Sequence, residues 1–377
     1  MSKIYLPHAE QFDIIKEHLR TIANALSMDM DISTWEGIQK AVRVGVAPDL
    51  IPVGTQLTVN HSVYGDMLFD VVAHNHYKSA YDENAHTMTL MSHKVIEKVQ
   101  YDSPEAFYYA EAELPAGTYN FTIATTLSSW AAGTYQFTLT QALPIYGQLC
   151  ISGQATTTLL SLQVNAYKDK QSTTATESVA ITLGNSGTSL GTFGVELNHA
   201  NRVSYGSNNY KESAIHQFLN GKGDAGSVWI PQTKFDRPPS WVATLAGFMN
   251  GLDSDFLTRV GEVVVPCAAN NMYESPDSTT MKGGKYNIRA NFYLPSQKEI
   301  FGATSEIVVD DSVQFPYYKD AISANRIKYK DSTPSYWWTR SAYRENGYTT
   351  RVVLSEGNMG GNGSHGTIGC VPVCTIV

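Results

Sequence analysis

The spacing of apolar side chains predicts two helices at the start of the chain. Between Pro7 and Leu26 they recur every three or four residues, the narrow seam of a short coiled coil. The seam consists of Phe12, Ile15, Leu19, Ile22 and Leu26. A capping-box pattern at Ser33-Thr34-Trp35-Glu36 begins a second helix, which ends at Gly45. We expect residues 1–47 to form an oligomerisation and docking module; the alternative is a helical hairpin that folds onto its own domain.

Strand patterns dominate residues 51–91, and five histidines are interspersed among them. The predicted strands are Gly54–Val59, Met67–Ala73 and Met88–Met91. The histidines are His61, His74, His76, His86 and His93. A His-x-His pair on a strand places both imidazoles on one face, as zinc ligands often require. No cysteine or acidic triad accompanies them, so we expect hydrogen-bonding histidines and no metal site.

Residues 110–196 change character, because Thr, Ser, Gly and Ala replace most of the charged residues. The stretch contains an internal echo, with Pro115–Ile123 matched by Ala131–Leu139. In each copy the order Gly-Thr-Tyr-x-Phe-Thr places Tyr and Phe on one face of a strand. Together with a predicted strand at Ser178–Leu183, this pattern indicates an inserted all-β sandwich. Both carbohydrate-binding domains and inert spacers have such sequences.

Two further helices are predicted in the second half of the chain. Ile215, Phe218 and Leu219 give one apolar stripe, and Gly221 ends that helix. The segment Leu294–Gly302 carries a capping box formed by Ser296 and Glu299. Upstream of the first helix, Tyr205, Asn208 and Asn209 are candidates either for ligand contact or for turn and capping roles.

The C-terminal segment, Tyr336–Val377, combines a rigid start, a polar middle and a β-forming end. It opens with the aromatic and basic cluster Trp337, Trp338 and Arg340 and closes with the β-forming run Thr367–Val377. Tyr, Arg, Asn, Gly, Ser and Thr dominate the middle, interrupted by the short buried strand Arg351–Leu354. This mixture is typical of paratopes, because Tyr gives contact area at low entropy cost and Ser, Gly and Asn give adaptable hydrogen bonds. The alternative is an ordinary loop-rich β region.

These motifs resemble those of a known family. The runs Trp337-Trp338-Thr339-Arg340-Ser341 and Ile368-Gly369-Cys370-Val371-Pro372-Val373, with Arg351-Val352-Val353 and Gly357 between them, are similar to a signature of C-type-lectin-like domains. Those domains belong to gut-bacterial phages and prophages, and some are variable proteins of diversity-generating retroelements. Residues 203–220 resemble a helix of the same family, with Phe218 where the family often has Trp. One departure is Val371, which stands where the family usually has Arg.

The resemblance implies an α+β fold with three parts. Residues 48–109 and 197–377 are expected to form a discontinuous C-type-lectin-like domain, into which the β-sandwich at 110–196 is inserted. Residues 1–47 form the helical N-terminal module of this arrangement.

The resemblance also implies that the polar middle of the C-terminal segment is a ligand surface that tolerates sequence change. The predicted contact residues are Tyr343, Arg344, Asn346, Tyr348, Thr349, Arg351, Ser355, Asn358, Asn362, Ser364, His365 and Thr367. Trp337, Trp338 and Arg340 are expected to form a rigid scaffold beneath them, because Trp buries a large apolar body and the Arg fork can hold loop carbonyls.

Charge and composition exclude several partners. The net charge of −8 and a pI near 5.7, without a clustered basic face, argue against a nucleic-acid partner. No stretch reaches transmembrane length, and the start has no apolar core of a signal peptide, so we expect synthesis in the cytoplasm and no membrane insertion. The resemblance implies a place on a phage tail or particle surface, with a protein or glycan ligand on a bacterial cell. Other virion proteins would bind the N-terminal module.

Three function classes follow. The first is a binding protein of a phage or prophage particle, for which we expect no cofactor. The second is an oxidase, because the formylglycine-generating oxidases, which use paired redox cysteines, have a similar fold. We expect Cys370 and Cys374 to lie about 13 Å apart on one strand, too far for a disulfide, so the sequence favours a protein that is not an enzyme. The third class is a structural spacer without a ligand.

The apolar seam between Phe12 and Leu26 predicts that the intact chain is a homo-oligomer, with a trimer favoured. Light scattering at micromolar concentration measures this, and a monomer contradicts it. Deletion of the N-terminal module, up to Gly45, is expected to release a folded monomer.

Overall fold

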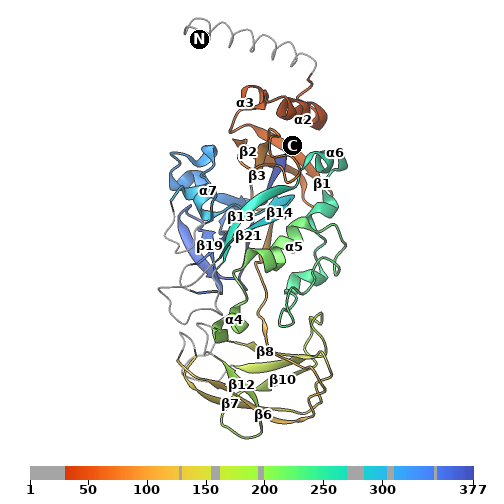
Figure 1. Cartoon of the computed structure of the whole chain (residues 1–377), viewed down its shortest axis with the longest axis vertical. Coiled ribbons are helices and arrows are strands. Elements are labelled where there is room, and N and C mark those ends of the chain that lie inside the picture. The colour runs from red at the N-terminus through yellow and green to blue at the C-terminus, as the bar shows by residue number, and fades with distance from the viewer. Residues whose placement is uncertain are drawn as a thin grey trace, which may run out of the picture.

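A computed structural model describes residues 30–126, 130–153, 162–193, 199–269, 284–303, 310–343 and 346–377. The predicted helix between Pro7 and Leu26, with its seam, lies outside these ranges. The described chain is mixed α+β and mostly β, with a smaller all-β part at one end and the C terminus near α2 (Trp35–Arg43) at the other (Figure 1). Whether the larger part is C-type-lectin-like stays a prediction.

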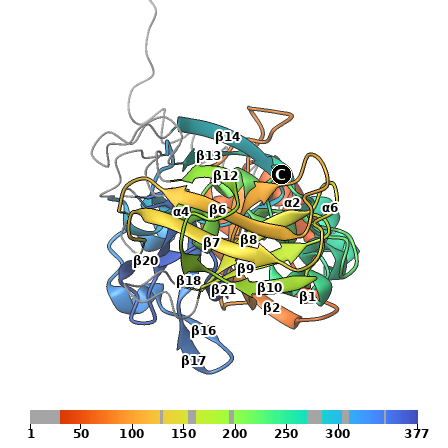
Figure 2. The same ribbon diagram turned by 90° about the horizontal axis from the view of Figure 1, so that it is seen from below.

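The smaller part consists of two four-stranded sheets around one core, compatible with the predicted β-sandwich. One sheet has the order β10-β9-β8-β5, formed by β5 (Ala106–Tyr109), β8 (Gln148–Ser152), β9 (Gln163–Tyr167) and β10 (Glu177–Ala180). The other has the order β11-β7-β6-β12, formed by β6 (Gly117–Ile123), β7 (Gly133–Leu139), β11 (Thr182–Leu183) and β12 (Thr188–Phe193). Both sheets contribute to the core, which includes Phe121, Leu149 and Val164. Figure 2 views the molecule from this end.

The echoed sequences form the two central strands of one sandwich sheet. β6 and β7 pair antiparallel over their full length, from Gly117 opposite Leu139 to Ile123 opposite Gly133. Each copy repeats one contact: the Tyr119 hydroxyl donates to the Pro115 carbonyl over 2.5 Å, and the Tyr135 hydroxyl donates to the Ala131 carbonyl over 2.7 Å. The sequence echo is therefore also a structural repeat.

The predicted strand Ser178–Leu183 is two strands in different sheets. β10 pairs with β9, whereas β11 pairs with β7 in the opposite sheet. The buried Ile181 lies between them. A continuous β-forming run carries no signal for a change of sheet, because both halves have the same propensity.

Two five-stranded sheets organise the larger part. The first has the order β1-β2-β3-β22-β15, formed by β1 (Gln56–His61), β2 (Gly65–His74), β3 (Met88–Ser92), β15 (Phe292–Tyr293) and β22 (Val373–Ile376). The second has the order β20-β19-β18-β21-β4, formed by β4 (Glu97–Gln100), β18 (Trp337–Ala342), β19 (Thr349–Val353), β20 (Met359–Gly363) and β21 (Thr367–Cys370). The predicted strands near residues 56, 67, 88 and 351 are confirmed.

The end of the chain joins both sheets, which corrects the single strand predicted there. β21 pairs with β4 and β18 in the second sheet, and β22 pairs with β3 and β15 in the first. Pro372, which has no N–H to donate to a ladder, lies between the two strands. Cys370 and Cys374 therefore lie in different sheets, and both are buried and free of disulfides.

Short helices and two smaller β units complete the described structure; the helix at His199–Tyr205 packs on the core of the smaller part. The two-stranded units are β13 (Val263–Ala269) with β14 (Gly284–Ala290), and β16 (Lys328–Lys330) with β17 (Thr333–Ser335), which projects from the molecule in Figure 2. The α-helices are α2, α3 (Ala47–Leu50), α4 (His199–Tyr205), α5 (Ala214–Asn220), α6 (Ser254–Arg259) and α7 (Gln297–Phe301). The 3-10 helices are Tyr210–Glu212, Ser240–Ala243, Phe248–Gly251, Pro316–Tyr318 and Ser323–Arg326.

The predicted second helix forms, but its cap and its packing differ from expectation. Thr34, rather than Ser33, is the N-cap, and its Oγ1 accepts a hydrogen bond from the Gly37 N–H over 3.1 Å. Ile38, Ala41 and Val42 are buried in the core of the larger part. This favours the alternative in which the helix folds onto its own domain. A deletion that tests the seam should therefore end before α2, so that this core stays covered.

A buried ion pair joins β18 of the second sheet to α7. Arg340 on β18 and Glu299 on α7 have no exposed surface, and Nη1 of the arginine lies 2.7 Å from Oε2 of the glutamate. Arg340 donates all five of its N–H groups, to both Glu299 oxygens, the Tyr77 hydroxyl, and the carbonyls of Leu294 and Pro266. Glu299 also accepts from the Ser296 N–H and completes the predicted capping box. The pair has the complete hydrogen bonding that buried charges require.

Removing one partner of this pair should be far more costly than removing both. We expect Arg340→Met to lose about 3–5 kcal/mol of unfolding free energy, because it leaves the Glu299 carboxylate buried without its counter-charge. Glu299→Leu combined with Arg340→Met should cost less than the sum of the two single changes. Urea unfolding of the four proteins measures this coupling, and additive costs would contradict it.

Candidate functional site

Trp337 and Trp338 form a completely buried base at the start of the C-terminal segment. Both rings have no exposed surface, and each indole N–H has a carbonyl partner. Trp337 donates to the Arg326 carbonyl over 3.1 Å and Trp338 to the Val99 carbonyl over 2.9 Å. With Arg340 beside them on β18, these residues lie where a scaffold beneath a surface is expected.

Three of the predicted contact residues lie together beside β20: Tyr343 directly after β18, and Thr349 and Arg351 on β19. The Arg351 guanidinium lies 4.2 Å from the centre of the Tyr343 ring. Thr349 and Tyr343 both approach Gly361, where an added Cβ would lie 3.1 Å from Thr349 Cγ2 and 3.2 Å from the Tyr343 ring. A larger residue at Gly361 would therefore displace the tyrosine that covers it.

Three rings continue this surface beyond the strands. Tyr348 stacks on Tyr205 with ring centres 5.1 Å apart. The ring centre of His365 lies 4.8 Å from that of Tyr205. The His365 N–H donates to the Tyr205 carbonyl over 2.9 Å, which fixes the two segments together. We call Tyr205, Tyr343, Tyr348, Thr349 and His365 the tyrosine surface; all five side chains are half-buried.

Three of the predicted contact residues make contacts within the C-terminal segment itself; two of them, Ser364 and Arg351, are buried. Ser364 is completely buried, and its hydroxyl pairs with the Thr350 hydroxyl and the Tyr348 carbonyl. Asn346 shapes the turn, because its Oδ1 accepts from the Tyr348 and Thr349 N–H groups. Arg351 is only 9% exposed and lies under Tyr343. Ser364 and Asn346 therefore hold the backbone of the segment, and Arg351 holds the Tyr343 ring.

The remaining predicted contact residues lie apart from the tyrosine surface. Ser355 and Asn358 belong to the turn between β19 and β20, where Asn358 Oδ1 accepts from the Ser323 hydroxyl over 2.7 Å. Asn362 is half-buried on β20, and Thr367 is exposed at the start of β21. Arg344 lies outside the described residues. A single ligand patch therefore does not contain all of the predicted set.

Asn208, which the sequence left open between contact and turn roles, is structural. It is 1% exposed, and its Nδ2 donates to the Asn346 and Thr349 carbonyls over 2.9 and 2.8 Å. Tyr205, by contrast, belongs to the surface. The segment before α5 therefore both supports and extends the C-terminal surface.

The histidines of the first sheet have separate partners. His61 and His74 bond to the carbonyls of Phe248 and Ile51, whereas His76 lies near Glu299 and His93 bonds Asp70. Asn75 has a φ of 52°, which ends β2 at His74 and takes His76 off the strand. The assumption that both imidazoles share one strand face was wrong. Within the described residues, no cluster of three metal-ligating side chains occurs.

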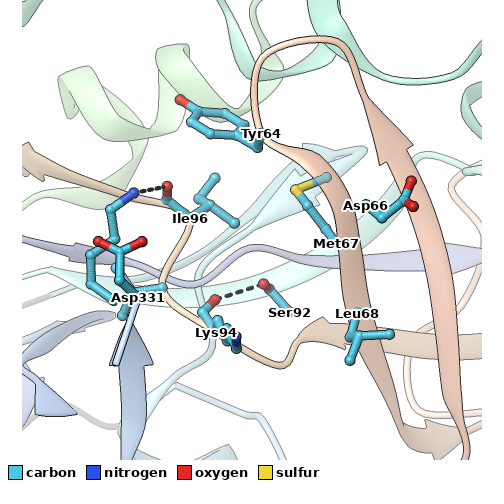
Figure 3. A pocket seen from close by; sticks show the side chains of 10 residues that line it. Tyr64, Asp66, Met67, Leu68, Ser92, Lys94, Ile96 and Asp331 are labelled. Atoms are coloured by element: carbon cyan, nitrogen blue, oxygen red, sulfur yellow. Dashed lines mark hydrogen bonds between the residues drawn. The ribbon is translucent and has the colours of Figure 1, made fainter. Parts of the chain in front are cut away.

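Two cavities accompany these features. One, of about 270 Å³, lies between β2 and the β16–β17 unit; Figure 3 shows Tyr64 and Met67 at one side and Asp331 at the other. Its Lys330 ammonium is already engaged with the Ile96 carbonyl over 2.7 Å. The other cavity, of about 300 Å³, lies between the sandwich and the larger part and includes Tyr205 and His365. Of these two cavities, the second, which we call the junction cavity, adjoins the tyrosine surface.

No pattern in the sequence indicates the residues that complete the junction cavity, such as Arg237 and Tyr167. They lie 70 positions apart in the chain, in different structural units.

Within the described residues, no helix has both the length and the apolar character needed to cross a bilayer.

Comparisons with known proteins give a family but no activity. A family model described as a domain of unknown function, DUF6273, matches residues 175–377. This match includes more than half of the chain, which therefore belongs to that family. It begins just before β10 in the sandwich and continues to the last residue. No curated protein and no solved structure matches the chain.

Stability measurements should separate the buried base from the exposed positions. We expect Trp337→Ala or Trp338→Ala to lose about 3–5 kcal/mol, because each leaves a large cavity and an unpaired carbonyl. Asn358→Ala and Thr367→Ala should stay within about 0.5 kcal/mol, since both side chains are exposed. Thermal melts of the four variants test this. Equal losses in the two groups would mean that the whole segment is core.

Proposed function

We propose that this DUF6273 protein is a ligand-binding protein of a phage or prophage particle, and that the tyrosine surface contacts a protein or glycan on a bacterial cell. The observation that carries the proposal is the layering of the C-terminal segment. Tyr343 and Tyr348 are half-buried and follow directly on β18, whose Trp337 and Trp338 rings are completely buried, and the half-buried Tyr205 stacks on Tyr348. The resemblance to diversified lectin-like proteins supports the placement on a particle.

The layering favours binding for a physical reason. Association costs less free energy when the contacting side chains are already ordered. Tyr205 and Tyr348 are ordered by their stacking, and Tyr343 by its contacts with Arg351 and Gly361. Tyr rings offer large contact area with few rotatable bonds, so this surface is prepared for a partner.

The chemistry of the cysteines favours binding over the oxidase alternative. Such an oxidase uses two cysteines that act together, and here Cys370 and Cys374 lie in strands of different sheets. Burial raises the pKa of both thiols, so the reactive thiolate is disfavoured. Incubation with a peptide substrate followed by mass spectrometry tests this directly, and turnover would overturn the proposal.

Binding to bacterial cells tests the proposed function. Fluorescently labelled full-length chain should bind at least one strain of a gut-bacterial panel in a saturable manner. Tyr348→Ala should weaken that binding by about tenfold or more, as expected for a central aromatic contact. Tyr329→Ala is the matched control, because Tyr329 is 42% exposed on the β16–β17 unit, outside the tyrosine surface.

Two outcomes would contradict the proposal. Absence of saturable binding across cells and a glycan array would favour the spacer role. Equal weakening by Tyr348→Ala and Tyr329→Ala would place the contact elsewhere on the protein. Thermal melts of both variants would show that each remains folded.

A further inference from the structure

The junction cavity has polar walls from two parts of the chain that are distant in sequence. β8 and β9 of the sandwich contribute Ser152, Asn165 and Tyr167, and the following loop contributes Thr173. The larger part contributes Tyr205, Arg237 and His365. At about 300 Å³, the cavity is at the lower end of the range for small-ligand sites, enough for one compact ligand.

A buried cation lies in the wall of this cavity. Arg237 is 4% exposed, and its guanidinium stacks 3.6 Å from the centre of the Tyr167 ring. Its hydrogen bonds go to neutral oxygens, namely Gln148 Oε1 and the carbonyls of Asp169 and Ser172. Among the ion pairs of the described residues, none includes Arg237. The charge of Asp169 acts on Arg237 from nearby but makes no direct ion pair with it, and a buried cation without a direct ion pair favours the entry of an anion.

The nearby carboxyl groups do not supply that counter-charge. No Asp or Glu is among the described residues that line the cavity. Glu105, behind the wall, already pairs with Arg202 at 3.0 Å. Burial raises the pKa of Asp236 to about 7, so this carboxyl is only partly charged at neutral pH. Asp169 is close enough for its charge to favour the Arg237 cation, but its Oδ1 accepts from the Gln171 and Ser172 N–H groups and the Ser172 hydroxyl, and it does not line the cavity. Arg237 is therefore the charged group in the cavity wall that a ligand carboxylate can pair with.

Hydroxyl groups and an aromatic ring give the cavity a second kind of chemistry. The hydroxyls of Ser152, Thr173 and Tyr205 have no hydrogen-bond partner among the described residues. They can both donate and accept, as the hydroxyls of a sugar ring require. The Tyr205 ring, held by Tyr348 and His365, adds an aromatic group to the cavity lining.

We propose that the junction cavity binds a single hexuronic acid, whose carboxylate pairs with Arg237 and whose hydroxyls bond to Ser152, Thr173 and Tyr205. A guanidinium and a carboxylate form stronger hydrogen bonds than two neutral groups do. This site goes beyond the tyrosine surface and does not depend on it, although Tyr205 and His365 belong to both. Its ligand contacts both the sandwich and the larger part.

Calorimetric titration of the full chain with glucuronate and galacturonate tests this assignment. At least one of them should bind, and more tightly than glucose, galactose or inorganic sulfate. Tyr205→Phe keeps the stacked ring but removes the hydroxyl, so affinity should fall about threefold to tenfold. Thr173→Trp should abolish binding, because the side chain is exposed at the cavity and the indole would fill it.

Controls distinguish the cavity from the tyrosine surface and from misfolding. Tyr329→Phe removes an exposed hydroxyl elsewhere and should leave the affinity unchanged. Tyr343→Ala should weaken cell binding but not hexuronate binding, because Tyr343 does not line the cavity. The assignment is overturned if neither hexuronate binds, if glucose or sulfate binds equally well, or if folded Thr173→Trp binds like the unmodified chain.

Discussion

The buried pair of Glu299 and Arg340 is the interaction on which the larger part depends. One guanidinium reaches β13 through the Pro266 carbonyl, the chain after β15 through the Leu294 carbonyl, and α7 through Glu299. Because two desolvated charges are costly unless all of their hydrogen bonds are made, this arrangement tolerates little displacement. The hydrogen bonds of Arg340 therefore fix the position of β18 and of the strands beside it.

The pH dependence of this pair has a defined sign. Burial alone would raise the pKa of Glu299, but the charge of Arg340 and the hydrogen bonds from His76 and Arg340 together outweigh it and hold that pKa below the ordinary value of 4.5. The stabilisation is therefore complete above the unfolded pKa and is lost as the pH falls through the lower, folded value. Neutral conditions retain the whole contribution, so the base under the tyrosine surface is most rigid there.

The two sites that we propose differ in their physical basis. The tyrosine surface is a set of stacked rings over a buried base, suited to a large partner. The junction cavity is a small polar space with an unpaired cation, suited to a small anion. Tyr205 and His365 connect them, since both side chains lie where the chain returns from the sandwich to the larger part. A ligand in the cavity would thus contact the edge of the surface.

Local patterns in the sequence determined much of the secondary structure. The β6–β7 repeat, α5 with its stripe of Ile215 and Phe218, and the capping box of α7 all follow from propensity and spacing within a few residues. The burial of Trp337 and Trp338 also follows from the sequence, since such large apolar rings are costly to expose to water.

Only the tertiary structure decided the features that depend on partners distant in sequence. Ser364 and Asn208 resemble surface residues in the sequence, yet the fold surrounds them with backbone groups from other segments. The split of the terminal run into β21 and β22, and of Ser178–Leu183 into β10 and β11, depends on which sheet each half meets. Packing likewise decided that Arg340 pairs with Glu299 and that Arg237 lines the junction cavity. Contacts between charged groups that are distant in sequence leave no periodic pattern along the chain.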